Sequence, residues 1–305
     1  MERSAPLPSP DLRTSLLAVV ELSKPVTWFP PMWAFGCGVV SSGQFSLDNI
    51  GLLIFGVLLA GPLLCAGSQA VNDWFDREVD AINEPGRPIP SGRIPGRWGL
   101  WIAIFWSVAG LVWAAFLGVW VLVAAAVGVA LSWAYSAPPV RLKRSGVWGP
   151  LSVGISYEGL AWFTGAAVMA QALPDGRTIL LAVLYSLGAY GIMVLNDFKA
   201  IEGDIKMGLK SLPAALGPRK AAWIACITMA APQFFVVALL AFWGQPIHAG
   251  IVGLSLLVQL LLMVRLMRDP KALAPWYNGT GVTLYVLGML ASAFALAGLN
   301  QGAVS

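Results

Sequence analysis

The sequence predicts an all-α protein that crosses a membrane nine times. Hydrophobic residues make up 58% of the 305 residues and charged residues only 11%, whereas a soluble domain carries roughly 25% charged residues. Long uncharged runs recur along the chain, and many approach the ~20 residues that a helix needs to cross a bilayer. Basic residues fall almost entirely in the segments that join these runs on one side.

The nine expected spans are 25–42, 50–73, 98–117, 119–136, 148–170, 178–197, 220–242, 247–265 and 276–298. The third and fourth come from one uncharged run, which at about 1.5 Å per residue is too long for a single span. We therefore break this run near Gly118. The expected organisation is an N-terminal cytoplasmic tail (1–23), a single membrane domain (24–298) with cytoplasmic loops at 74–97 and 198–219, and a C-terminal tail (299–305).

The distribution of positive charge supports this count. With nine spans, 18 of the 19 Lys and Arg residues lie on one face and only Arg177 lies on the other. The positive-inside rule makes the basic face cytoplasmic, so that the N-terminus is inside and the C-terminus outside. Because the basic residues flank membrane segments, the net charge of +4 does not indicate nucleic-acid binding.

A group of acidic and amide side chains begins at the end of the second span. Asn72, Asp76 and Asp80 are spaced i, i+4, i+8, so they share one face if the helix continues, and Asp73 lies beside them. Like charges at this spacing repel, and the C-terminal end of a helix disfavours carboxylates. A divalent cation would reverse both effects. The alternative is a solvated helix end with ordinary surface ion pairs.

A second group, NDFKAIEGD at 196–204, ends the sixth span on the same predicted face. Oxygen ligands without Cys or His select Mg²⁺, which usually completes its coordination shell with substrate phosphate. Nearby Arg and Lys side chains would hold the remaining phosphate oxygens. The recurrence of Asn-Asp on one face favours a metal and phosphate site between two halves of the chain over a solvated surface.

Several stretches resemble the UbiA superfamily of intramembrane prenyltransferases, and within it the chlorophyll and bacteriochlorophyll synthase branch. They are NDWFDREVD (72–80), KPVTWFPPMWAFGCG (24–38), RPIPSGRIP (87–95), YSAPPVRLKRSGVWGP (135–150), SYEGLAWFTGA (156–166) and NDFKAIEGD (196–204). The resemblance covers most of residues 20–298, and the short N-terminus makes the chain most similar to the bacterial bacteriochlorophyll enzymes. Many superfamily members carry Asp where this chain has Ala200, which leaves mainly Asp197 and Asp204 for the second metal site.

The resemblance implies nine helices around a central cavity in a bacterial inner (cytoplasmic or intracytoplasmic) membrane, with the C-terminus periplasmic. It implies Mg²⁺-dependent transfer of a C20 isoprenyl group, geranylgeranyl or phytyl, from its diphosphate. The acceptor is the propionate carboxylate of bacteriochlorophyllide or chlorophyllide. The implied partners are these two substrates and the lipid bilayer, and no protein partner can be read from the sequence.

The resemblance assigns roles to individual residues, and the position of Glu158 inside a predicted span adds a role for Glu158 and its neighbours. The expected metal ligands are Asn72, Asp73, Asp76, Asp80, Asp197 and Asp204. The expected diphosphate-binding residues are Arg87, Lys143, Arg141 and Lys199. The expected catalytic residues are Asp76, Asp80, Asp197 and Glu158, and the expected tetrapyrrole contacts are Glu158, Tyr157 and Trp162.

Alternatives remain open at three levels. Glu158 lies inside the fifth span, where a carboxylate is costly and usually functional, but a protonated or hydrogen-bonded glutamate that holds helices together is the other interpretation. Lys143 is either a phosphate ligand or a charged anchor at the end of a span. For the whole protein, the alternatives are prenylation of an aromatic ring or of haem, and a transporter or pigment-assembly factor. A transporter more commonly carries its acidic residues at mid-membrane.

Overall fold

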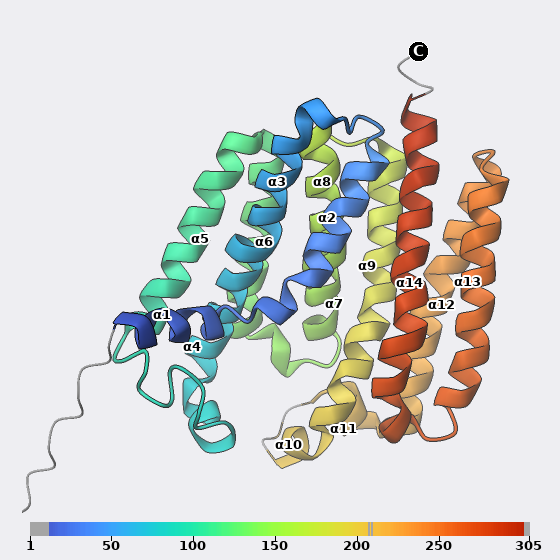
Figure 1. Ribbon diagram of the computed structural model, residues 1–305. Coiled ribbons are helices and arrows are strands. Elements are labelled where there is room, and N and C mark those ends of the chain that lie inside the picture. The colour runs from blue at the N-terminus through green and yellow to red at the C-terminus, as the bar shows by residue number, and fades with distance from the viewer. Residues whose placement is uncertain (1–11, 207, 209, 302–305) are drawn as a thin grey trace, which may run out of the picture.

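Helices make up the regular structure of the part of the chain described here, residues 12–206, 208 and 210–301. In this computed structural model the long helices stand side by side, and short helices lie at one end of them (Figure 1). The single extended pairing in the described ranges is an isolated bridge between Ser145 and Lys210. The predicted all-α class is confirmed for these residues.

In the first half of the chain the elements are α1 (Leu12–Leu22), η1 (Pro25–Thr27), α2 (Phe29–Ser41), η2 (Leu47–Asn49), α3 (Ile50–Leu58), η3 (Leu59–Cys65), α4 (Ala66–Asn83), α5 (Trp98–Leu117) and α6 (Val119–Ser136). In the second half they are η4 (Leu142–Arg144), α7 (Trp148–Gly154), η5 (Ile155–Leu160), α8 (Ala161–Ala170), α9 (Gly176–Asn196), η6 (Asp197–Ala200), α10 (Ile201–Lys206), α11 (Leu212–Leu216), α12 (Pro218–Phe242), α13 (Pro246–Leu266) and α14 (Pro270–Gln301). Two of the η elements, η3 and η5, are π-helical turns inside longer helices.

Seven helical segments of the described chain are long and apolar enough to cross a membrane. They are Leu47–Asn83, Trp98–Leu117, Val119–Ser136, Gly176–Lys206, Pro218–Phe242, Pro246–Leu266 and Pro270–Gln301. The two other predicted spans are helical as well. However, α2 has only 13 residues, and the α7–η5–α8 helix contains Glu158 among Gly, Ser and Thr residues. The chain is a polytopic helical protein, and the count of nine spans stays a prediction.

Three predicted boundaries differ from the structure. The segment predicted as a loop at 74–97 is helical as far as Asn83, and the segment at 198–219 contains η6, α10 and α11. At the C-terminus, α14 continues to Gln301, while residues 1–11 and 302–305 of the predicted tails lie outside the described residues. The extension of α4 has a physical cause, because cations from other segments neutralise the carboxylates of its last turns.

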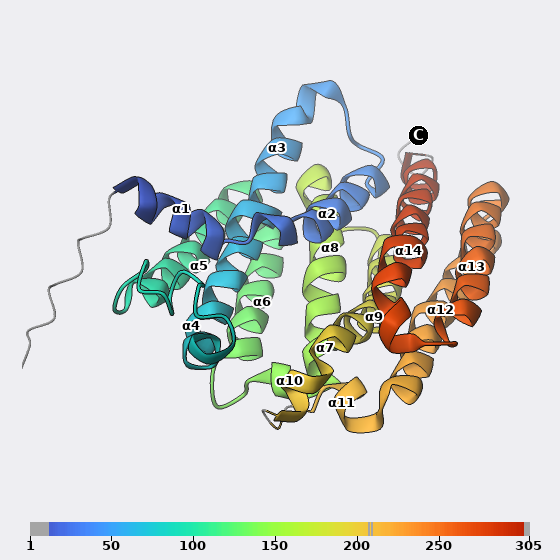
Figure 2. The same cartoon turned by 60° about the horizontal axis from the view of Figure 1, so that its bottom comes forward.

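The short helix α1 lies across the end of the bundle rather than along it (Figures 1 and 2). It packs Ala18 and Leu22 against α4 and α5. Leu16, Leu17 and Val20 on the rest of the helix are exposed, as in helices that lie in the membrane interface. This agrees with an N-terminal segment that lies on the membrane surface.

Glycine residues bring α2 and α8 into close contact. A Cβ atom on Gly38 would lie 2.0 Å from the carbonyl oxygen of Trp162, and one on Gly165 would lie 2.0 Å from that of Phe35. Small residues at such positions let two membrane helices approach backbone to backbone. The contact holds α2 against the helix that contains η5.

The two π-helical turns face each other across the interior. Cys65, at the end of η3, donates a hydrogen bond to the hydroxyl of Tyr157 in η5 (3.4 Å). Pro62 lies within η3 and has no N–H to donate to a regular helix. Such turns occur frequently at functional sites, and both of these line the cavity described next.

Candidate functional site

A cavity of about 470 Å³ opens between α2, η3–α4, α6, η5 and α9. Most of its wall is apolar, with Pro31, Leu59, Leu64, Val129, Leu131 and Leu160 among the lining residues. Both predicted polar clusters reach it, because Asn72 from α4 and Asn196 from α9 line the same cavity. The cavity therefore joins a polar end to an apolar interior.

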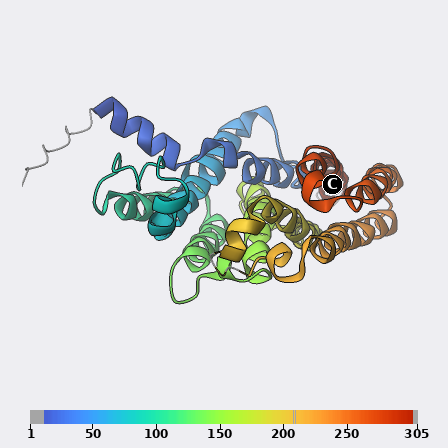
Figure 3. The same cartoon turned by 90° about the horizontal axis from the view of Figure 1, so that it is seen from below.

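The polar end lies where the short helices gather. Figures 2 and 3 show the end of α4, the connection from α6 to α7, and α10–α11 at this same end of the bundle. Tyr135, at the end of α6, lines the cavity. The negative charges of Asp197, Asp76 and Asp204 all act on its hydroxyl group, so carboxylates of both clusters lie near it. The predicted meeting of two clusters from separate halves of the chain is therefore present in the fold.

Asp76 on α4 pairs with two basic residues of the connection between α6 and α7. Its carboxylate accepts from Lys143 Nζ (2.6 Å) and from Arg141 Nη2 (3.1 Å). Arg141 has a positive φ of 42°, a conformation rare for residues with a side chain. Burial lowers the pKa of Lys143, while Asp76 acts to raise it. Two cations therefore lie beside the carboxylate of Asp76, one helical turn beyond Asn72, which lines the cavity.

Asp73 and Asp80 share one arginine. Arg87 Nη1 lies 2.8 Å from Asp80 Oδ2 and 3.4 Å from Asp73 Oδ1, and Lys24 Nζ lies 2.6 Å from Asp73 Oδ1. Asp73 is only 2% exposed, and its Oδ2 atom has no hydrogen-bond partner among the described residues. Arg87 also binds Glu84 through two hydrogen bonds.

These contacts favour the charged forms of Arg87 and Glu84. Burial opposes the charge of Arg87, but its hydrogen bonds to Glu84 and the charges of Asp73 and Asp80 raise its pKa above the usual value. The same hydrogen bonds lower the pKa of Glu84. Arg87 and Glu84 are therefore charged at neutral pH.

The second cluster has a different environment. Asp204 is 8% exposed and accepts a hydrogen bond from the Ser211 hydroxyl. No ion pair within 4.0 Å reaches Asp197 or Asp204 in the described part of the chain. Lys199, predicted to bind diphosphate, is exposed and makes no ion pair there. In the same region Asn278 of α14 donates to Asn196 Oδ1 (2.8 Å).

The described residues by themselves do not form a complete metal cage. Across the ranges that the structure describes, no three His, Cys, Asp or Glu side chains lie close enough to hold a metal ion. The available ligands are hard oxygens, including the unpartnered Oδ2 of Asp73 and Oδ1 of Asn278. Such a donor set suits Mg²⁺ that takes part of its shell from substrate phosphate.

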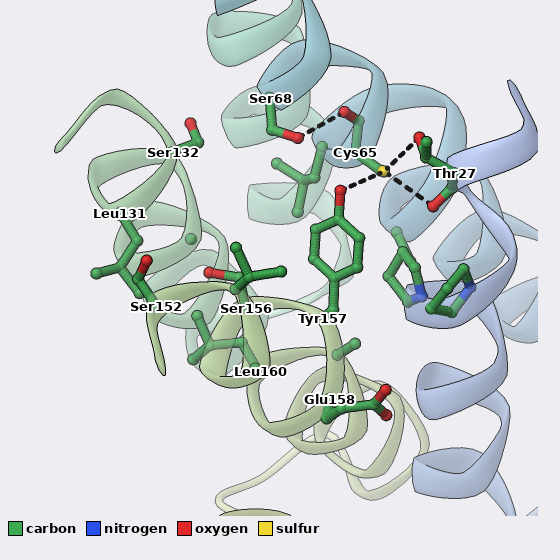
Figure 4. Close-up of a pocket in the computed structure, with 18 of the residues that line it drawn as sticks. Thr27, Cys65, Ser68, Leu131, Ser132, Ser152, Ser156, Tyr157, Glu158 and Leu160 are labelled. Atoms are coloured by element: carbon green, nitrogen blue, oxygen red, sulfur yellow. Dashed lines mark hydrogen bonds between the residues drawn. The ribbon is translucent and has the colours of Figure 1, made fainter. Parts of the chain in front are cut away.

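The predicted tetrapyrrole contacts divide into two groups. Tyr157 and Glu158 line the cavity, and in Figure 4 the Tyr157 hydroxyl points toward Cys65 while the Glu158 carboxyl points away from it. Glu158 is 7% exposed, and its Oε2 atom has no partner among the described residues. The expectation for Trp162 is wrong. Trp162 is fully buried, donates to Ser41 Oγ and stacks on Tyr185, away from the cavity lining.

Two further polar residues of the site were not assigned a role from the sequence. Lys24 binds Asp73 across 49 residues of chain, and Gln69 donates to the Tyr157 hydroxyl (3.0 Å). Lys24 is the first residue of the stretch 24–38 that resembles the family, and this position could have indicated a role in the site. Gln69 carried a weaker signal, since it precedes Asn72 by one helical turn.

A model of the UbiA prenyltransferase family matches residues 27–280. The chain belongs to this family. It is 56% identical over 283 residues to the bacteriochlorophyll synthase 33 kDa chain of Cereibacter sphaeroides, covering 93% of this chain and 94% of the relative. It is 46% identical to the 34 kDa chain of Chloroflexus aurantiacus, covering 92% and 91%. It is also 38% identical to the chloroplastic chlorophyll synthase of Oryza sativa, covering 90% and 76%.

Solved structures of UbiA-type proteins share the fold. A structure reported for digeranylgeranylglyceryl phosphate synthase matches with a TM-score of 0.74 at 21% identity, covering 92% of this chain and 99% of that one. A UbiA homolog from Archaeoglobus fulgidus bound to GPP and Mg²⁺ matches with a TM-score of 0.71 at 18% identity, with the same coverage. The sequence-based assignment to the UbiA superfamily and to its bacteriochlorophyll synthase branch is confirmed.

Proposed function

We propose that this UbiA prenyltransferase esterifies the propionate carboxylate of bacteriochlorophyllide with a C20 isoprenyl diphosphate, geranylgeranyl or phytyl, and releases diphosphate. The observation that carries the proposal is the largely apolar cavity lined by Asn72 and Asn196, each of which is followed in the chain by the charged side chains of its cluster. The names of the relatives in Cereibacter and Chloroflexus support the choice of pigment.

The polar end suits the diphosphate. Arg87, Lys143 and Arg141 would donate to phosphate oxygens, and Lys24 would add a fourth cation; what supports this is that all four pair with the carboxylates of α4. Mg²⁺ held by Asn72, Asp73, Asp76, Asp80, Asp197 and Asp204 would stabilise the negative charge that develops on the departing diphosphate. Asp76, Asp80 and Asp197 are catalytic in this sense.

The apolar part of the cavity suits the isoprenyl chain and the macrocycle. An oxygen of the substrate propionate forms a bond to C1 of the isoprenyl group as the C1–O bond to diphosphate breaks, and the electron pair leaves with the diphosphate. No protein nucleophile takes part. The apolar walls exclude water, which would otherwise capture the allylic cation. We place Glu158 and Tyr157 on the tetrapyrrole side, because both line the cavity.

The test is a reconstitution with defined substrates. Purified protein, Mg²⁺, bacteriochlorophyllide and geranylgeranyl diphosphate should yield an esterified pigment, detected by chromatography and mass, and EDTA should abolish it. Parallel reactions with chlorophyllide, phytyl diphosphate, haem and an aromatic acid test the other acceptors and tails. Absence of any pigment ester in both detergent and lipid would refute the assignment. Uptake of solute into liposomes without transfer activity would indicate a transporter instead.

We further propose nine spans in a bacterial inner membrane, with the N-terminus cytoplasmic and the C-terminus periplasmic. The α2 and α7–η5–α8 helices supply the two spans beyond the seven recognised by length and hydropathy. A Cys introduced at Gly86, exposed beside the acidic cluster, should react with an impermeant thiol reagent only from the cytoplasmic side. One introduced at Gly176, exposed at the start of α9, should react only from the other side.

The native Cys residues, Cys37, Cys65 and Cys226, are buried, so the background labelling in this experiment should be low. Labelling of the Gly86→Cys protein from the periplasmic side would overturn the orientation. Labelling of both variants from the same side would overturn the count of spans between them.

A further inference from the structure

The two acidic clusters of the site differ in what neutralises them. Every carboxylate contributed to the site by α4 already touches a protein cation. Asp73 contacts Lys24 and Arg87, Asp80 contacts Arg87, and Asp76 contacts Arg141 and Lys143. In the second cluster, Asp197 and Asp204 have no such partner within 4.0 Å in the described chain, whereas the exposed Glu202 pairs with Lys271. The first cluster is therefore closed to a bare cation by its own ion pairs, and the second is open.

The same cations are the residues placed to bind diphosphate. Arg87, Arg141 and Lys143 cannot keep their full contacts with carboxylates while they donate to phosphate oxygens, because a guanidinium or ammonium group has a limited set of donors. Binding of a diphosphate would therefore release the α4 carboxylates. Asp73 Oδ2, buried and without a partner, is an oxygen left ready for a ligand.

We propose that the two clusters load metal in a fixed order, which rests on the proposed function. A divalent cation enters at Asp197 and Asp204 without diphosphate. The carboxylates of Asp76, Asp73 and Asp80 accept metal only when a diphosphate takes over Arg87, Arg141, Lys143 and Lys24. Each cation then exchanges a carboxylate partner for a phosphate partner, and each carboxylate exchanges a protein cation for a metal ion.

This exchange couples the two ligands thermodynamically. Diphosphate should tighten metal binding at the first cluster, and metal should tighten diphosphate binding by the same factor, as linkage requires. We expect a factor of about 10–100, within the usual range for coupled sites. Diphosphate that binds without a metal ion would take the cations away from the α4 carboxylates, and these carboxylates would then repel it. The negative charge of the departing diphosphate would therefore be stabilised only when its metal ion is bound.

The experiment measures Mn²⁺ binding to the full-length protein by electron paramagnetic resonance, with and without inorganic pyrophosphate. Wild-type protein should bind Mn²⁺ without pyrophosphate at one class of site, which Asp204→Asn weakens and Asp76→Asn does not. Pyrophosphate should create a second class of site, which Asp76→Asn removes. Loss of the pyrophosphate-independent site in Asp76→Asn but not in Asp204→Asn would overturn the order.

A double variant gives the sharpest test. Arg141→Gln with Lys143→Gln frees Asp76 of both cations, so the second class of site should appear without pyrophosphate. The matched control is Arg219→Gln with Lys220→Gln, which removes the same two charges from exposed positions at the start of α12. A double variant that binds Mn²⁺ like this control contradicts the proposal. If the double variant fails to fold, Lys143→Gln alone should show the same effect more weakly.

Failure of this inference can be separated from failure of the proposed function. Mn²⁺ binding requires neither pigment nor turnover, so ordered loading without any ester product would retain the loading scheme and reject the pigment substrate. Ester formation by a protein whose two metal sites fill together, without dependence on pyrophosphate, would retain the function and reject the order.

Discussion

The Asp76→Asn protein is expected to lose about 10³-fold in kcat/KM, the size of effect seen when one group that stabilises a developing charge is removed. Asp76 is the α4 carboxylate that faces both Arg141 and Lys143, and it belongs to the proposed metal site. The amide keeps the shape of the side chain but loses the charge needed to hold a metal. The measurement is the initial rate of pigment ester formation at several Mg²⁺ concentrations.

The matched control for this variant is Glu78→Gln. Glu78 lies two residues away on the same helix, is 86% exposed, and forms its ion pair among the described residues with the neighbouring Arg77. Its replacement should leave the rate within about twofold of wild type, since exposed ion pairs contribute little. Near-wild-type activity of a folded Asp76→Asn protein would show that the cluster is a surface feature rather than a metal site.

Replacement of Glu158 by Leu is expected to make the protein more stable and the enzyme worse. A buried carboxyl oxygen without a partner destabilises a fold by about 1–3 kcal/mol, and Leu removes it. The KM for the pigment should rise by about 10–100-fold, because a polar residue that lines the cavity contributes to pigment binding. Thermal unfolding and steady-state kinetics measure the two effects.

A loss of stability in the Glu158→Leu protein would instead indicate a structural role for Glu158. If Glu158 joined helices through a hydrogen bond, Glu158→Leu would lower the unfolding temperature, and Glu158→Gln would largely restore it. A gain of stability with loss of pigment affinity, and binding of Mn²⁺ with pyrophosphate unchanged, is expected only from a group that serves the substrate.

Much of the fold could be predicted because a membrane limits the choices of the chain. In lipid the backbone must satisfy its own hydrogen bonds, so each long apolar run becomes a helix. The predicted segments 98–117, 119–136 and 148–170 coincide with α5, α6 and α7–η5–α8. The break at Gly118 was readable too, and this residue has a φ of 133°, which glycine adopts without a steric penalty.

The candidate site was predictable to the extent that helical spacing decides it. Asn72, Asp76 and Asp80 lie on one continuous helix, as their spacing indicated. Trp162 was predicted wrongly, because a tryptophan near a buried glutamate looks the same in the sequence whether it faces a cavity or a neighbouring helix. Only the packing of α8 against α2 and α9 assigned it to the interior.

The sequence alone determined the helical class and the residue types of the site, since each depends on composition or on spacing within one segment. Only the tertiary structure decided which cation meets which carboxylate. Lys24, Arg87 and Lys143 come from three separate segments, yet all reach α4. Pairings between segments depend on how the helices pack in three dimensions, and no local pattern in the chain specifies them.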